Sequence, residues 1–505
     1  LSVLLEGTGF TYRVEGRAVI LSPAPRAEAG AIQLGALRVE GASGAAGGAS
    51  VDAFGRGGDP ADRPYETAGA SHYISSEQIA RFGGETAGDI FKSTPGVISA
   101  SNHNGASVDV NIRGMQGQNR VRVTIDGTQQ STTTWRGYQG ADERVYIDPD
   151  MISEVSIAKG PSGGAAGAGV VGGVVEVSTL TVADIVEGDR DWGFRIKGGL
   201  SDNAVSAAAP ASMTQRRGGG ALLDHENGSI SLAGGRRGDR FDLVAAFAYR
   251  KTGNYVAGAH GDTTYQVAGN SYNWPLSFTK PGEEVFNTSQ ENWSALVKGV
   301  VRWGGSQALE LGYAHYDGKF GETMHSVLFT QDSSFRQVKL TRAATDTYTA
   351  RYRWNPSELI DLKANVWASR VDATTRSVGP AFYLPPWITP ETRPPADDPR
   401  LSITNTYGVD ATNRSQLETP FGAVALRYGG SYLIEDMDGR AYFSRIYASD
   451  GPVVMRPSIG TREISSLFGD GEWQARPWLR LNGALRYDGY RIKEKGQASI
   501  VGAYT

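Results

Sequence analysis

The chain of 505 residues contains no cysteine. This absence excludes a disulfide framework and any metal site built from thiolates. No segment approaches the roughly 20 consecutive apolar residues that a membrane-spanning helix needs, so the composition does not fit a helical membrane protein. The formal net charge is only −4, which argues against a nucleic-acid partner.

Motifs of two common enzyme classes are also missing. The sequence has no His-Glu-x-x-His zinc motif and no Gly-x-x-x-x-Gly-Lys-Ser/Thr phosphate loop. Asp148 and Asp150 lie close together, as paired catalytic carboxylates do. The segment Asp148-Pro149-Asp150, however, is typical of a turn before a short helix. We therefore predict that the protein is not an enzyme and holds no prosthetic group.

What the chain does contain is glycine, at 66 residues, and aromatic residues, at 10%. This composition without long apolar runs is typical of β-rich proteins. After Asp191, apolar and polar residues alternate in runs of about 10 residues, which predicts the strands of a transmembrane β-barrel. The runs span residues 192–200, 229–235, 241–249, 295–303, 308–316, 346–354, 361–368, 424–433 and 479–487.

The connections between these runs alternate in length. Long polar or proline-rich inserts at 255–292 and 379–400 are typical of extracellular loops, and we expect no regular structure in them. Short turns at 304–305, 355–356 and 476–477 predict the periplasmic end of the barrel. Aromatic residues near the run ends predict an interfacial girdle, namely Trp303, Trp354, Trp473 and Trp478.

An ordered series of short motifs lies between residues 86 and 177. It reads "DIFKSTPGV", "NIRGM", "RVTIDG" and "SEVSIAKGP", followed by a glycine-rich run over 163–173. Residues 121–125 and 155–157 predict strands, the first turning at Asp126-Gly127 and the second ended by Gly160-Pro161. Short helices are predicted from Ser75 and over 87–93. Short strands and helices that are separated so closely by turns predict a small domain.

The series resembles the plug domain of TonB-dependent outer-membrane receptors, and the runs after Asp191 resemble the start of that family's barrel of about 22 strands. The resemblance implies a mainly β fold: a transmembrane antiparallel β-barrel, incomplete in this chain, with an α+β plug in the lumen. We expect Arg113 and Arg144 to pair with acidic groups on the wall or in the plug, because buried guanidinium groups need partners, and in the family such pairs hold the plug in the lumen. The alternative for each is a solvated surface arginine. The expected plug-core residues are Arg113, Gly114, Asp126, Gly127, Lys159, Gly160 and Pro161.

The resemblance divides the chain into four parts. Residues 1–25, with an expected helix end over 1–5 and strands at 10–14 and 18–21, are similar to the second half of a periplasmic signalling domain, whose partner is an anti-sigma regulator. The alternative is a stray hairpin. A Gly/Ala-rich linker covers 26–70, the plug 71–180 and the first part of the barrel 190–505. Because there is no leader and the strand pattern is still running at the end, we expect a fragment of a longer outer-membrane receptor with its N-terminal segment in the periplasm.

In one segment of the linker, residues 36–41, apolar and polar residues alternate as they do in a β-strand. In the family, a short extended segment at this place pairs with the energy-transducing protein TonB by strand addition, a mode with loose sequence demands. The alternative is an ordinary apolar patch in a linker. The TonB-box-like residues are Ala36, Leu37, Arg38, Val39, Glu40 and Gly41.

Two polar plug loops, 99–107 and 129–142, resemble the apical loops that touch ligand in the family. They carry the candidate ligand-binding residues His103, Asn104, Trp135, Arg136 and Tyr138. The phrases "NIRGMQGQNRVRVTIDGTQQ" and "YRKTGNYVAG" resemble the haem-receptor branch, which implies haem as the transported ligand and a haem-carrier protein as a further partner.

In that branch a plug histidine and a loop histidine clamp the iron, so His103 is the candidate iron ligand. His260 and His325 are weaker candidates for the second ligand, which is expected beyond Thr505. The alternative within the family is a ferric-siderophore receptor, which would use Trp135, Arg136 and Tyr138 but no histidine. A β-rich adhesin is the alternative outside the family.

Overall fold

The computed structural model describes residues 10–15, 18–23, 63–66, 69–82, 86–99, 106–117, 120–130, 132–135, 141–162, 164–207, 211–212, 227–261, 264–266, 273–275, 279–322, 336–337, 339–376, 399–441 and 459–495. The chain forms two compact units, residues 1–50 and 51–505. In the first unit, β1 (Phe10–Glu15) and β2 (Ala18–Pro23) form an antiparallel hairpin. This hairpin confirms the two strands predicted there. The helix end expected over 1–5 and the segment 36–41 lie outside the described residues.

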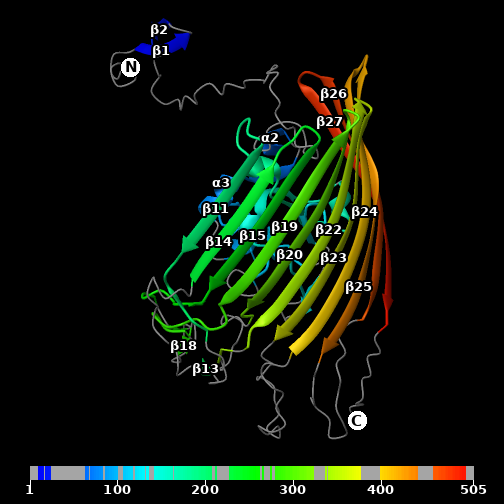
Figure 1. Ribbon diagram of the computed structural model, residues 1–505. Coiled ribbons are helices and arrows are strands. Elements are labelled where there is room, and N and C mark those ends of the chain that lie inside the picture. The colour runs from blue at the N-terminus through cyan, green and yellow to red at the C-terminus, as the bar shows by residue number, and fades with distance from the viewer. Residues whose placement is uncertain are drawn as a thin grey trace. The chain divides into compact units, whose positions relative to one another are not determined.

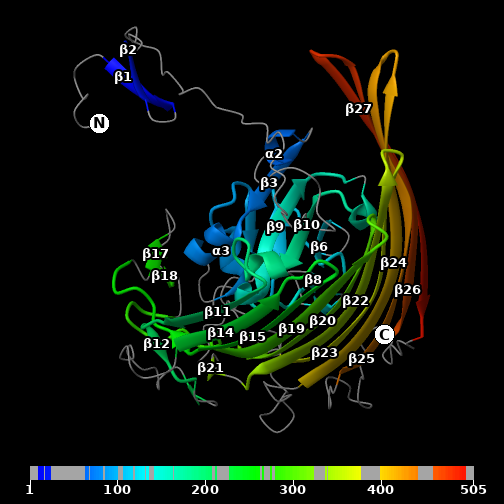
Figure 2. The same ribbon diagram turned by 45° about the horizontal axis from the view of Figure 1, so that its top comes forward.

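The second unit contains a small four-stranded sheet with the order β3-β9-β10-β6, which lies behind the long strands in Figure 1 and is labelled in Figure 2. Its strands are β3 (Ala70–Ile74), β9 (Ile152–Lys159), β10 (Gly173–Thr179) and β6 (Val121–Ile125). β10 runs parallel to β6, and the other pairs are antiparallel. The strands expected at 121–125 and 155–157 are thus confirmed. Two short antiparallel pairs flank the sheet: β4 (Val97–Ser99) with β5 (Val110–Ile112), and β7 (Thr133–Trp135) with β8 (Ala141–Glu143).

Helices around this sheet are short. α2 spans Arg63–Glu66 and α3 spans Ser76–Phe82. Ser75 and Gln78 exchange side-chain-to-backbone hydrogen bonds of 3.3 and 3.1 Å, a capping box that explains why α3 begins where it was predicted. The helix predicted over 87–93 is a 3₁₀ helix, η1 (Ala87–Phe91), which ends before Pro95. Three more 3₁₀ turns are η3 (Pro149–Met151), η4 (Ala165–Gly167) and η5 (Val182–Asp184).

A large antiparallel sheet of eleven strands forms the wall around the small sheet (Figure 2). In sequence order these strands are β11 (Trp192–Leu200), β14 (Asn227–Arg236), β15 (Phe241–Thr252), β19 (Gln290–Trp303), β20 (Gln307–Phe320), β22 (Thr341–Ser357), β23 (Ile360–Arg376), β24 (Pro399–Thr419), β25 (Gly422–Ala441), β26 (Gly460–Arg476) and β27 (Leu479–Glu494). Each pairs with the next in an up-and-down order, as predicted for a barrel wall.

Two of these strands, β24 and β26, were not among the predicted runs. β26 contains few large apolar residues on its outward face, so its alternation is weak. The alternation of β24 through Ile403, Tyr407 and Val409 is recognisable in the sequence and was missed. The 255–292 insert was expected to lack regular structure, which is wrong in part. It contains β17 (Thr264–Gln266) paired with β18 (Asn273–Pro275). Other short pairs near the loop end are β12 (Ala204–Val205) with β16 (Asn254–Tyr255) and β13 (Ala211–Ser212) with β21 (Arg336–Gln337).

The two faces of the wall have opposite character. Large apolar side chains lie exposed on the outward face, among them Phe194, Leu243, Val297, Leu311, Val366 and Leu467. Polar and charged side chains are buried on the inward face, among them Lys298, Glu310, Thr345, Thr347, Thr404 and Ser466. This is the reverse of a water-soluble sheet and is typical of a barrel wall that faces lipid.

Tryptophans gather near the ends of the wall strands that meet in short turns. Trp303, Trp354, Trp473 and Trp478 are all exposed, as expected for an interfacial girdle. None of the helices within the described part of the chain is long and apolar enough to cross a membrane.

The hydrophobic core joins the small sheet to the wall. Ile125, Val155 and Val175 from the small sheet belong to one buried cluster with Val244 and Leu296 from wall strands β15 and β19. The small sheet therefore packs directly against the inner face of the wall. We call the part of the unit before β11 the plug.

Candidate functional site

Two sequence motifs of the plug encode the same tight turn. Ile112 and Met115 exchange backbone hydrogen bonds of 2.8 and 2.9 Å, and Ile125 and Thr128 exchange bonds of 2.9 and 2.8 Å. The two residues inside each turn have positive φ: 52° and 88° for Arg113-Gly114, 50° and 78° for Asp126-Gly127. Positive φ at both central positions defines a type I′ hairpin turn.

The first turn corrects one expectation. Arg113 is exposed at the tip of its turn, and among the described residues it makes no ion pair, so the predicted pairing with an acidic group is wrong. Gly114 and Pro161 are also exposed, and Lys159 is only partly buried. These residues mark the turns and edges of the plug rather than its core. Lys159 Nζ donates to Pro95 O at 2.7 Å, and burial followed by the nearby Arg113 guanidinium lowers the pKa of Lys159.

The second turn places Asp126 in the boundary between plug and wall. Its carboxylate accepts hydrogen bonds from Thr179 N (3.0 Å) and Thr179 Oγ1 (2.6 Å), which ties the end of β6 to the end of β10. Lys298 Nζ on β19 lies 2.8 Å from the same carboxylate and also donates to Thr179 O at 3.2 Å. Both charged side chains are buried.

Electrostatics favour the ionised form of this aspartate. Burial alone would raise the pKa of Asp126, but Lys298 and then Arg351 on the wall lower it, as do the hydrogen bonds from Lys298 and Thr179. The result is a pKa of about 2. Asp126 is therefore a buried carboxylate that depends on a cation of the barrel wall.

A second group of contacts joins the Asp148-Pro149-Asp150 turn to the wall strands β11, β15 and β19. Asp148 caps η3 by accepting from Asp150 N at 2.9 Å, which confirms the predicted turn before a short helix. Arg250 on β15 lies 3.3 Å from Asp148 and 3.1 Å from Asp150. Asn292 on β19 donates to Asp148 at 2.8 Å, and Lys197 on β11 lies 3.7 Å from Asp150. These two aspartates hold the plug to the wall.

A third group lies at the end of the wall from which the long connections leave. Arg144 is fully buried and forms an ion pair with Glu322, just after β20. This pair confirms the expectation for Arg144. Nearby, the ring of Tyr146 stacks on Tyr316 and Phe320 of β20 with centroid distances of 5.7 and 5.8 Å. The contacts of Arg250, Asn292 and Glu322 thus fasten the plug near this end of the wall, and Lys298 holds it near the middle of β19.

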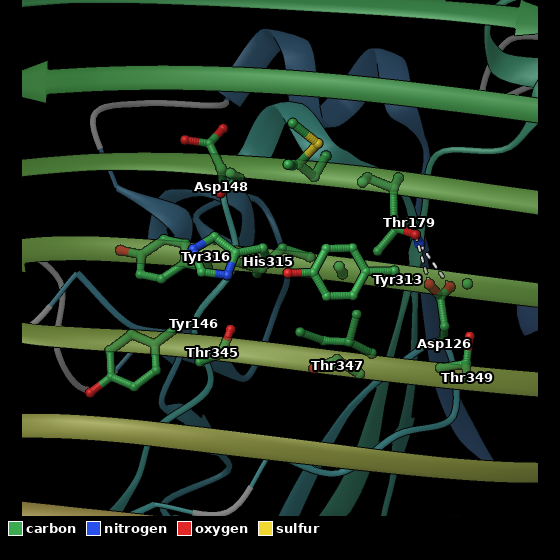
Figure 3. A pocket seen from close by; sticks show the side chains of 18 of the residues that line it. Asp126, Tyr146, Asp148, Thr179, Tyr313, His315, Tyr316, Thr345, Thr347 and Thr349 are labelled. Atoms are coloured by element: carbon green, nitrogen blue, oxygen red, sulfur yellow. Dashed lines mark hydrogen bonds between the residues drawn. The ribbon is translucent and has the colours of Figure 1, made fainter.

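A cavity lies between Asp126, Asp148 and Thr179 of the plug and Ser294, Thr345 and Thr347 of the wall (Figure 3). Its volume is about 40 Å³, whereas pockets for small organic ligands typically measure about 300–1,000 Å³. Apolar side chains such as Ile125, Met151 and Leu296 supply most of its lining, and its volume is close to that of one or two water molecules. A second cavity between plug and wall, of about 50 Å³, lies between Gly127 and Gln129 of the plug and Trp367 of the wall, and neither cavity has room for a ligand of haem size.

Most of the candidate ligand residues lie outside the part of the chain that the structure describes. His103, Asn104, Arg136, Tyr138 and His325 lie outside the described residues, and Trp135 ends β7 with its side chain outside them. His260 is exposed after β16. No cluster of three or more metal-binding side chains occurs among the residues that the structure describes. The roles proposed for these residues remain predictions.

Sequence reasoning missed the wall partners Arg250, Lys298 and Glu322. Arg250 and Lys298 lie next to or in a predicted strand, Glu322 lies a few residues after one, and an inward position for Lys298 follows from the alternation of β19. The signal for Lys298 was a lysine in the middle of a mostly apolar run. Pairing it with Asp126 required the register between plug and wall, which only the folded structure provides.

Comparisons with known proteins agree with this architecture. The family model of the TonB-dependent receptor plug domain matches residues 63–174, and that of the TonB-dependent-receptor-like β-barrel matches 292–501. The hemophilin receptor of Acinetobacter baumannii is 28% identical over 472 residues, which cover 85% of this chain and 44% of the relative.

Two solved structures show a similar fold. A double mutant of the Serratia marcescens hemophore receptor HasR, in complex with its hemophore HasA and heme, has a TM-score of 0.63 at 22% identity and covers 85% of this chain and 53% of its own. The siderophore receptor PirA from Acinetobacter baumannii has a TM-score of 0.59 at 14% identity and covers 86% and 59%. The chain spans about half the length of these proteins.

A plug ion-paired inside an antiparallel wall with an apolar outer face defines an outer-membrane β-barrel receptor. The two matching models together cover well over half of the sequence, and the chain belongs to the TonB-dependent receptor family. This family consists of transporters and receptors rather than enzymes.

Proposed function

We propose that this chain provides the plug and part of the barrel of a receptor that imports haem across the bacterial outer membrane, with energy supplied through TonB. A haem-carrier protein delivers the ligand. The 28% identity to the hemophilin receptor over 85% of this chain is the observation that carries the choice of haem. The likeness to HasR is compatible with it but does not decide the ligand, because the siderophore receptor PirA has nearly the same TM-score.

The contacts that hold the plug against the barrel wall support the proposal that transport requires an energy source. Buried ion pairs join Asp126 to Lys298 and Arg144 to Glu322, and two cavities between plug and wall, of about 40 and 50 Å³, are too small for haem. Haem does not fit between plug and wall at these places. A transported ligand requires the plug to rearrange, and work done from the periplasmic side supplies the energy for that step.

We also propose the remaining roles from the sequence. Residues 36–41 add as a strand to TonB, and residues 1–25 belong to a periplasmic signalling domain that contacts an anti-sigma regulator. The linker over 26–70, the plug over 71–180 and the barrel from 190 onward complete the arrangement. His103 in the first apical loop ligates the haem iron, and His260 and His325 are the weaker candidates for a second ligand.

A ferric-siderophore receptor is the second candidate function, favoured by the fold shared with PirA. In that case Trp135, Arg136 and Tyr138 contact the ferric chelate and histidine is dispensable.

Growth separates the two functions. We would express the full-length receptor in an iron-starved strain that lacks its own haem and siderophore receptors, with and without TonB, and supply haem or a panel of ferric siderophores as the iron source. Growth on haem that requires both receptor and TonB is expected. Growth on a ferric siderophore but not on haem would replace the proposal by the second candidate.

A further inference from the structure

We propose that the plug separates from the described wall strands first along its glycine-rich run, so that the passage for the ligand opens between residues 164–169 and strand β27. The inference rests on the proposed function, because a passage is needed only where a ligand crosses. It follows from a difference between two sets of contacts that hold the plug. The wall curves around the plug, so β15 and β27 face it from different sides (Figure 2).

On the side of β15 and β19, the cations of the wall are paired with carboxylates of the plug. Lys298 on β19 is paired with Asp126. Arg250 on β15 is paired with Asp148 and Asp150. Lys298, Asp126 and Asp148 are buried. Opening the boundary here would separate buried charges of opposite sign, which is strongly unfavourable.

On the side of β27, the wall carries both charges of an ion pair. Arg486 and Asp488 lie on this one strand, with Arg486 Nε 2.8 Å from Asp488 Oδ1. The plug contributes backbone groups to the pair: Gly164 O accepts from Arg486 Nη1 at 2.6 Å, and Gly169 N donates to Asp488 Oδ2 at 3.1 Å. When the plug moves away here, Arg486 and Asp488 remain paired with each other, and water replaces two hydrogen bonds.

The glycine-rich run has the residues that such a contact needs. Residues 164–169 are all glycine or alanine, so this part of the plug has no charged side chain. A Cβ at Gly167 would lie 3.1 Å from Arg486 Nη1, and a Cβ at Gly169 would lie 2.0 Å from Tyr490 Oη. Glycine therefore allows the plug backbone to approach the side chains of β27 closely.

The apolar contacts of the plug differ in the same direction. In the cluster that includes residues of β15 and β19, the plug buries large side chains such as Ile125 and Val175. The glycine-rich run contributes one alanine, Ala168, to a buried cluster with Leu433 and Ile464 of the wall. Because apolar stabilisation grows with the area buried, the wall holds the glycine-rich run more weakly.

Thiol labelling of the ligand-free, full-length receptor in detergent tests this order of release without any assumption about the ligand. The 505 residues contain no cysteine, so one cysteine introduced into a cysteine-free receptor reports its own position. The matched variants are Ala168→Cys, in the glycine-rich run, and Ala248→Cys, on β15, since both alanines are buried in clusters that plug and wall share. In urea below the unfolding transition, we expect a maleimide to label Ala168→Cys at least tenfold faster than Ala248→Cys. Equal rates, or faster labelling of Ala248→Cys, would overturn the proposal whatever the ligand is.

Cross-linking extends the test to transport, with radiolabelled haem as the probe. Joining Ala168→Cys to Ile464→Cys with a short bifunctional thiol reagent should lower haem uptake at least tenfold. Joining Ile185→Cys to Gly235→Cys is the control and should lower uptake less than twofold, because a Cβ at Gly235 would lie 3.3 Å from Ile185 Cβ, at a contact on β14 that we expect to stay closed.

Normal haem uptake by the receptor cross-linked between Ala168→Cys and Ile464→Cys would overturn the proposal. Failure of the wild-type receptor to take up haem would instead refute the proposed ligand, and the labelling rates would still decide where the plug separates first.

Discussion

Lys298 Nζ lies 2.8 Å from the carboxylate of Asp126, across the boundary between the barrel wall and the plug. Both groups are buried, and the aspartate sits in a type I′ turn that also ties β6 to β10 through Thr179. The pair therefore connects the fold of the plug sheet to its position in the barrel.

Replacing Lys298 by methionine should destabilise the seated plug by roughly 3–5 kcal/mol, because a buried carboxylate loses its cation. The midpoint of urea-induced protease sensitivity of the plug, measured in detergent, reports this loss. Lys319→Met is the control, since Lys319 is exposed on β20. An equal midpoint for Lys298→Met and wild type would show that the pair does not hold the plug.

The Asp126 pair should also make the plug sensitive to acid. The pKa of Asp126 is lowered from 3.8 to about 2, so its contribution is fully present above about pH 4 and is lost as the pH falls through 2. The shift corresponds to roughly 2 kcal/mol. The stability gap between wild type and Asp126→Asn, measured by urea unfolding, should narrow over this range. A gap that stays constant down to pH 2 would contradict the lowered pKa.

The two type I′ turns offer a matched pair of glycine substitutions. Gly114 and Gly127 have φ values of 88° and 78°, so alanine at either position is strained by roughly 1–2 kcal/mol. A Cβ at Gly127 would also lie 3.0 Å from Asn365 Nδ2 on β23, whereas Gly114 has open space around it. Gly127→Ala should therefore lower the urea midpoint of the plug more than Gly114→Ala. Equal effects would mean that the wall does not restrict the second turn.

Much of this fold was predictable from sequence because short local patterns encode its strands and turns. Alternation over 192–200 and 241–249 directly encodes wall strands β11 and β15, and the dipeptide Asp126-Gly127 encodes its turn. The prediction for Arg113 was wrong because the same local rule, a type I′ turn, places that residue at an exposed tip.

The contacts between plug and wall could not be predicted from local sequence patterns. Glu322 and Lys298 meet plug residues that are far away in the chain, and no local pattern encodes their register. β26 escaped prediction because small and polar residues occupy many of its outward positions, whereas β24 was missed although Ile403, Tyr407 and Val409 alternate in it. The candidate iron ligand His103 rests on a resemblance and stays a prediction.

A substitution in the TonB-box-like segment is expected to abolish uptake without abolishing haem binding. Strand addition needs backbone donors, and proline removes one, so Val39→Pro should abolish TonB-dependent uptake while haem still binds. Ala46→Pro, in the same linker but outside the segment, is the control. Uptake and binding are measured with radiolabelled haem in whole cells. Normal uptake by Val39→Pro would place the TonB contact elsewhere.

The central claim is that this receptor binds haem through its plug. Its most direct test is a haem titration of the full-length receptor in detergent, followed by Soret absorbance, for wild type, His103→Ala and His260→Ala. We predict a saturable Soret band that weakens and shifts in His103→Ala and changes little in His260→Ala. A wild-type receptor with no saturable band would contradict the claim and identify a ferric siderophore as the ligand to test next.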